Sequence, residues 1–196
     1  MVRPNPDSQT RMDTELEAAA RQKFLALLGE FTLNWNFAEL WLRQIVQIKS
    51  APTLAGWVLT VDLQASQLLN ALKALATDFS EGQEKAHLLA FHDGLDALRV
   101  TRNTYVHGIA RLSVSPTWTA SMVQSFSARK GRLKAFDLQI FPEDLERAVI
   151  DSGAWAEYGR QILECSVGLS PNGWVSLVTP SKHSAIPTTR RPVLGV

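Results

Sequence analysis

The sequence predicts a mainly α-helical protein, an up-and-down helical bundle with a small antiparallel β-hairpin inserted into it. Three observations indicate this class. Apolar residues recur every three or four positions over long stretches, prolines and glycines separate those stretches, and a strict alternation of apolar and polar residues appears only after residue 108. With 196 residues, 45% of them hydrophobic, the chain is long enough to bury a core as one domain.

The first helix carries the clearest periodic signal in the chain. Residues 1–13 are polar and contain prolines, so we expect a flexible N-terminal tail with Asp13 or Thr14 as the N-cap of the helix. Pro52 ends the helix, because proline cannot continue the hydrogen-bond ladder. Its apolar positions are spaced alternately by four and three residues: Phe24, Leu28, Phe31, Trp35, Ala38, Leu42 and Ile45. Such a stripe is typical of a helix that packs against other helices.

Three further helices are predicted. The second ends near Phe79, the third runs from about Gln83 to Gly108, and the last opens at Pro142 and continues to about Cys165. The core residues predicted for the second helix are Ala65, Leu68, Leu72 and Leu75, those for the third are Leu88, Phe91, Leu95 and Leu98, and those for the last are Leu145, Val149, Tyr158 and Ile162.

The β insertion is expected at about residues 109–141. Apolar and polar residues alternate at 109–114 and 136–140, and Arg129-Lys130-Gly131 is typical of a hairpin tip. Residues 167–196 are rich in proline, glycine, serine and threonine, so we expect a poorly ordered C-terminal tail after a helical domain at 14–166.

Composition excludes several classes of protein. The single cysteine, Cys165, cannot form an intramolecular disulfide or a thiolate metal cluster, and the histidines show no spacing typical of metal ligands. The N-terminus lacks the apolar core of a signal peptide, and no apolar run of eighteen residues follows it. We therefore expect a soluble, cytoplasmic protein without metal or cofactor.

The charges are unevenly distributed, although the net charge is only +1. Residues 1–98 have 8 Lys and Arg against 12 Asp and Glu, a balance of −4, whereas residues 99–196 have 12 against 7, a balance of +5. An anionic partner such as RNA suits this basic half. Alternatively, the acidic half packs against the basic half, and their opposite charges cancel. The basic residues that could hold RNA phosphates are Arg99, Arg111, Arg129, Lys130 and Arg132, or these are simply solvated charges.

One short motif contains side chains that could take part in a reaction. At the predicted end of the third helix stands the sequence Arg102-Asn103-Thr104-Tyr105-Val106-His107-Gly108. It resembles the signature of HEPN domains, in which an arginine is followed by a polar residue and, after a short spacer, by a histidine. The resemblance extends loosely over residues 24–166. It implies a HEPN-like helical bundle and a homodimeric, metal-independent endoribonuclease of a toxin–antitoxin, defence or stress system, with Arg102, Asn103 and His107 at the dimer interface.

The residue types fit that chemistry. Imidazole titrates near neutral pH and can move a proton to or from a ribose oxygen, and a guanidinium can stabilise charge that grows on a phosphate. On a straight helix, His107 lies roughly 140° around from Arg102, whereas Asn103 and His107 share one face. A second copy across a twofold axis would complete such a site, with Asn103 orienting His107.

Structural roles for the same residues remain open. Arg102 could be a clamp paired with Glu39 of the first helix, and His107 could cap helix carbonyls. Tyr105 could stack on a base, although a core position is favoured. The alternative function is a non-catalytic HEPN-like dimer that binds RNA, a nucleotide or a protein partner such as an antitoxin.

Overall fold

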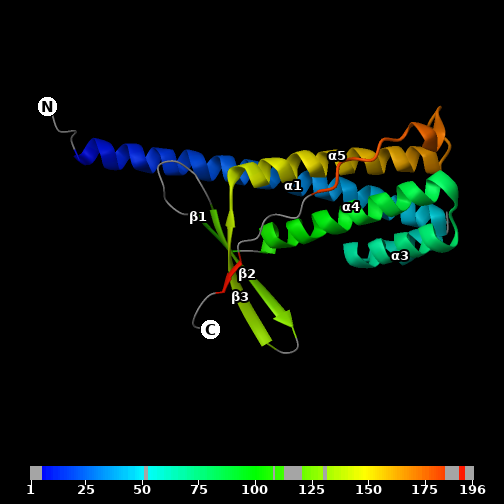
Figure 1. Cartoon of the computed structure of the whole chain (residues 1–196), viewed down its shortest axis with the longest axis horizontal. Helices are drawn as coiled ribbons and strands as arrows, with labels where there is room; N and C mark the ends of the chain where they lie inside the picture. Colours follow the sequence, from blue (N-terminus) through cyan, green and yellow to red (C-terminus); the bar gives the residue numbers. More distant parts are fainter. Residues whose placement is uncertain are drawn as a thin grey trace. The chain divides into compact units, whose positions relative to one another are not determined.

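The computed structural model describes residues 6–50, 53–107, 109–112, 121–129, 132–183 and 190–192, with side chains for 14–50, 53–54, 56–106 and 140–183. The protein is mainly α-helical, as predicted (Figure 1). Its helices are α1 (Pro6–Ser50), α2 (Leu54–Val61), α3 (Ala65–Asp78), α4 (Gly82–His107) and α5 (Pro142–Ser166), with a 3-10 helix at Gly173–Ser176. None of the helices in this described part has the length and apolar character needed to cross a membrane.

The chain forms two compact units. The larger, which we call the helical unit, comprises residues 31–102 and 148–185. It contains the second half of α1, all of α2 and α3, most of α4 and most of α5. The other unit comprises residues 1–30, 103–147 and 186–196 and contains the strands. Helices α1, α4 and α5 therefore each contribute residues to both units.

The predicted apolar stripes form the core. Six of the seven stripe positions of α1 are buried, and the predicted lines of α4 and α5 are buried throughout. On α3, Leu68 and Leu72 are buried together with Leu69 and Ala76. The buried side chains that carry these predictions are Phe24, Phe31, Trp35, Ala38, Leu42, Ile45, Leu88, Phe91, Leu95, Leu98, Leu145, Val149, Tyr158 and Ile162.

Two glycines allow α4 and α5 to approach each other closely. A Cβ atom at Gly94 of α4 would lie 2.4 Å from the ring of Trp155, and one at Gly159 of α5 would lie 2.5 Å from the ring of Phe91. Each glycine therefore accommodates an aromatic ring of the other helix. Both rings are fully buried, so this contact lies at the centre of the helical unit.

Three strands follow α4 in the chain, and a fourth follows α5. Strands β1 (Ile109–Leu112), β2 (Ser121–Arg129), β3 (Arg132–Ile140) and β4 (Arg190–Pro192) form one antiparallel sheet in the order β1-β2-β3-β4. The β2–β3 pairing runs from Ser121 opposite Ile140 to Arg129 opposite Arg132. In the same unit, Lys23 of α1 forms an ion pair of 2.6 Å with Glu146 of α5.

The helix boundaries differ from the prediction in two places. Helix α1 begins at Pro6, within the residues 1–13 that the sequence predicted as a flexible N-terminal tail. The stretch between Thr53 and Phe79 forms two helices separated by Asp62, Leu63 and Gln64, where one was expected. The sequence of α2 is almost entirely apolar, so it has no 3.6-residue alternation from which a separate helix could be predicted.

Residues 167–183, which the sequence predicted as part of a poorly ordered tail, contact α4 and α5. We call these residues the C-terminal segment. Trp174 stacks on His87 of α4, with ring centroids 6.1 Å apart, and Thr179 lies within hydrogen-bond distance of Tyr158 of α5. His183, at the end of the described segment, is buried. Contacts with α4 and α5 hold this segment, although its composition resembles that of a linker.

Candidate functional site

The predicted motif lies in the last two turns of α4. Arg102 and Asn103 are both half-buried, and the helix continues to His107. The boundary between the two units falls between Arg102 and Asn103. The side chain of His107 lies outside the described residues. The backbone is nevertheless helical across the whole Arg102 to His107 spacing, which places Asn103 and His107 on one face of α4.

Glu39, the predicted structural partner of Arg102, is bound by its own helix instead. Its carboxylate accepts a hydrogen bond of 3.0 Å from the indole of Trp35 and lies 3.4 Å from the guanidinium of Arg43. Both partners are four residues away on α1, where side chains stand one above the other. Glu39 thus belongs to the surroundings of Arg43.

The other predicted phosphate-binding residues are only partly described. Arg99 is held by Asp96 of the same helix through two hydrogen bonds of 2.9 and 2.7 Å, which reduces its availability to an anion. The backbones of Arg111, Arg129 and Arg132 lie in β1, β2 and β3, and their side chains, like the whole of Lys130, lie outside the described residues.

Tyr105 is a core residue and not a stacking platform. Only 3% of it is exposed, so a base cannot reach its ring while α4 keeps this conformation. Burial raises the pKa of its hydroxyl, and the charge of Asp144 raises this pKa further. Burial also raises the pKa of Tyr158, the second of the chain's two tyrosines.

The two tyrosines predict a specific alkaline behaviour. Since burial disfavours the phenolate at both positions, we expect neither to ionise near the ordinary pKa of 10.0 in the folded protein. Their contribution to stability should be complete below pH 10 and fall as the pH rises above it, because the unfolded chain then releases protons first. Ultraviolet titration should show tyrosinate absorbance appearing together with the loss of helical circular dichroism. A tyrosine that ionises near pH 10 in the folded state would contradict this burial.

The structure also reveals a buried polar array that sequence reasoning missed. It consists of Asp151 on α5, His183 in the C-terminal segment and Thr101 on α4. The Asp151 carboxylate accepts a hydrogen bond of 2.7 Å from Nδ1 of His183, and Nε2 of His183 lies 2.9 Å from the hydroxyl of Thr101. No spacing in the sequence indicates this array, because it joins residues that are 32 and 82 positions apart.

The order carboxylate, imidazole and hydroxyl resembles the arrangement that activates a nucleophile. The Thr101 hydroxyl is too buried for that role. Thr101 is only 2% exposed, so a substrate cannot approach its oxygen. The backbone N–H of Thr101 lies inside α4, where it takes part in the hydrogen bonds of the helix. It is therefore not available to stabilise an oxyanion. The array instead ties the C-terminal segment to both helices.

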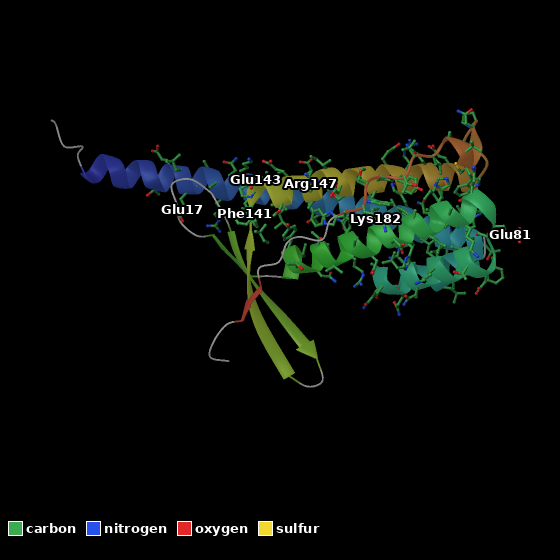
Figure 2. The ribbon with its side chains drawn as sticks, in the orientation of Figure 1. Glu17, Glu81, Phe141, Glu143, Arg147 and Lys182 are labelled. Carbon is green, nitrogen blue, oxygen red and sulfur yellow. The ribbon has the colours of Figure 1, made fainter. Side chains whose placement is uncertain are left out.

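An open pocket of about 320 Å³ lies beside His183. Lys182, labelled in Figure 2, lines it together with Val100, Asp93 and Asp96 of α4. The two carboxylates make it a poor site for a phosphate. No group of three or more His, Cys, Asp or Glu residues suited to a metal ion occurs in the part of the chain described.

Comparisons with known proteins add no relative of this chain. No protein-family model matches the sequence, and no curated protein or solved structure is significantly similar to it. A function must therefore be inferred from the residues and contacts described above.

Proposed function

We propose that this protein is a HEPN-like, metal-independent endoribonuclease, with the β element of residues 109–141 inserted before its last helix. Arg102 would stabilise the charge that develops on the scissile phosphate. His107 would transfer a proton to or from the 2′-oxygen or the leaving 5′-oxygen. Asn103 would hold the imidazole through a side-chain hydrogen bond.

The observation that carries the proposal is the unbroken helix of α4 from Arg102 to His107. It supports the role of Asn103, because residues four apart on a helix are neighbours. It also places residue 107 at the C-terminal end of α4. Arg102 and His107 lie about 140° apart on such a helix, which favours a site completed by a second copy.

The proposed mechanism predicts the products and the requirements of the reaction. Attack by the 2′-oxygen should leave a 2′,3′-cyclic phosphate, and RNA methylated at the 2′-oxygen of the scissile nucleotide should resist cleavage. Chelators should not lower the rate, because the proposed mechanism assigns proton transfer and charge stabilisation to side chains. Electrophoresis and mass spectrometry of matched RNA and 2′-O-methyl RNA, with and without EDTA, would measure this. Undiminished cleavage of the methylated site, or activity restored by magnesium after EDTA, would rule the mechanism out.

A non-catalytic dimer that binds RNA, a nucleotide or a protein is the second candidate. The ion pair between Arg99 and Asp96 favours this second candidate, because it makes one of the basic residues predicted to bind substrate less available. The two candidates differ in one measurement. Under the second, RNA or nucleotide would bind and remain uncleaved at every concentration of protein.

A further inference from the structure

The polar array of Asp151, His183 and Thr101 lies close in sequence to the places where the chain passes from one unit to the other. These crossings fall after residues 30, 102, 147 and 185. Thr101 is the second residue before a crossing, His183 is the third before another, and Asp151 is the fourth after a third one. The array therefore joins α4, α5 and the C-terminal segment where each of them leaves the helical unit.

The end of α4 has a single buried side chain within the helical unit. Of residues 99–102, Thr101 is buried, at 2% exposed, whereas Val100 is exposed and Arg99 and Arg102 are half-buried. Burying so small a polar side chain removes little apolar surface from water, and a buried hydroxyl needs a hydrogen-bond partner. The bond of 2.9 Å between the Thr101 hydroxyl and Nε2 of His183 is therefore a contact that fixes this turn.

The chemistry of the array sets the direction of its hydrogen bonds. An ionised carboxylate can only accept, so the Nδ1 atom that lies 2.7 Å from Asp151 carries a proton. When the imidazole is neutral, its Nε2 atom is then an acceptor, and the Thr101 hydroxyl donates to it. The His183 side chain is 1% exposed, so solvent does not compete for these bonds.

Helix α5, to which the array ties α4, is itself tied to α1 near the remaining crossing. The side-chain amide of Asn34, the fourth residue after that crossing, donates a hydrogen bond of 3.2 Å to the backbone carbonyl of Val149. Val149 is two residues before Asp151 on α5. The end of α4 is thus joined through His183 to a part of α5 that α1 holds in place.

We propose that His183 is a positioning residue for the candidate site, because through Thr101 it fixes the turn of α4 that carries Arg102. The inference rests on the proposed function, since it concerns the placement of a group assigned to RNA cleavage. Arg102 follows Thr101 directly, so a movement of this turn moves Arg102 with it. A displacement of about 1 Å at a catalytic group can lower a rate by about a hundredfold.

Thr101→Val and Thr60→Val are a matched pair of variants. Both threonines are buried, at 2% and 5% exposed, and valine is close to threonine in size but lacks the hydroxyl. The Thr60 hydroxyl donates to the carbonyl of Gly56 on its own helix, α2. Thr101→Val should lower kcat for RNA cleavage by about ten- to a hundredfold and leave KM unchanged, because Arg102 is assigned to charge that develops during the reaction. Thr60→Val should change neither constant.

Two variants of Asp151 separate positioning from proton transfer. Asp151→Asn keeps an oxygen that accepts the hydrogen bond from Nδ1 of His183, so it should cleave RNA at close to the wild-type rate. Asp151→Ala removes this acceptor and should lower kcat as Thr101→Val does. Equal losses in the two variants would show that the reaction needs the charge of the carboxylate, and this would overturn the positioning role.

Hydrogen–deuterium exchange measures the hold on α4 without any cleavage. Peptides that cover residues 99–107 should exchange faster in His183→Ala and Thr101→Val than in the wild type, and at the wild-type rate in Thr60→Val. Circular dichroism checks that each variant is folded. Unchanged exchange in His183→Ala, or faster exchange together with an undiminished kcat, would overturn the proposal. A wild type that cleaves no RNA would refute the proposed function and with it the positioning role, whereas faster exchange would still show that His183 holds this turn.

Discussion

Replacing His107 or Arg102 by alanine is expected to lower RNA cleavage by at least about two orders of magnitude. The first change removes the group proposed to transfer the proton, and the second removes the charge proposed to stabilise the phosphate. The rate of cleavage of a defined RNA in single-turnover experiments measures both. Arg160→Ala is a matched control, because Arg160 is an exposed arginine of α5 that forms ion pairs with Glu157 and Glu164. This control should cleave at the wild-type rate.

Mixing the two inactive variants tests whether the site is shared between copies. If Arg102 of one copy acts with His107 of the other, a mixed dimer retains one intact site. Random exchange makes half of the dimers mixed, so about a quarter of the wild-type activity should return. No recovery after exchange would mean that one copy supplies both groups. Unchanged cleavage by either single variant would contradict the assigned roles, and an accompanying loss of thermal stability in Arg102→Ala would indicate a structural clamp.

Replacing Gly94 by alanine is expected to destabilise the helical unit by about 1–3 kcal/mol, the usual cost of overfilling a packed core. The new methyl group would lie 2.4 Å from the ring of Trp155, which is buried and cannot turn away. Chemical denaturation followed by circular dichroism gives the change in the free energy of unfolding.

Gly29→Ala is the control for this prediction. Gly29 is also helical, but nothing lies within 4 Å of its expected Cβ atom. The intrinsic preference of alanine for helix should then make this variant more stable by up to about 1 kcal/mol. Equal effects of the two substitutions would show that the close approach of α4 and α5 does not limit packing.

The sequence predicted the helical core well, because burial on a helix leaves a pattern along the chain. Phe31, Trp35 and Leu42 on α1 and Phe91 and Leu95 on α4 are all buried as their spacing predicted. Helix α2 was missed for the opposite reason. Its sequence is almost entirely apolar and so shows no alternation, and the rule that apolar positions are buried would also have failed, because its large apolar residues are exposed.

The contacts of the C-terminal segment could not be predicted from the sequence. They depend on single side chains, Trp174, Thr179 and His183, whose partners on α4 and α5 are distant in the chain. The candidate site was predicted as a motif on a helix, and α4 does extend through it. Tyr105 is buried, the position that the sequence favoured over base stacking. The proposed pairing of Glu39 with Arg102 was not found, because a helical spacing gives the face of a residue but not its neighbour on the other helix.

The helical unit is built from two separate segments of the chain, residues 31–102 and 148–185. It therefore cannot finish folding during synthesis until the second segment has been made. Helix α4 leaves the ribosome about 80 residues before His183, which at about 5–20 residues per second is a delay of several seconds. During that time, the faces that later pack on α5 and the C-terminal segment stay exposed. Translation that stops before residue 183 omits the histidine that joins Asp151 to Thr101. The contacts of the helical unit can therefore be completed only after translation has passed residue 183.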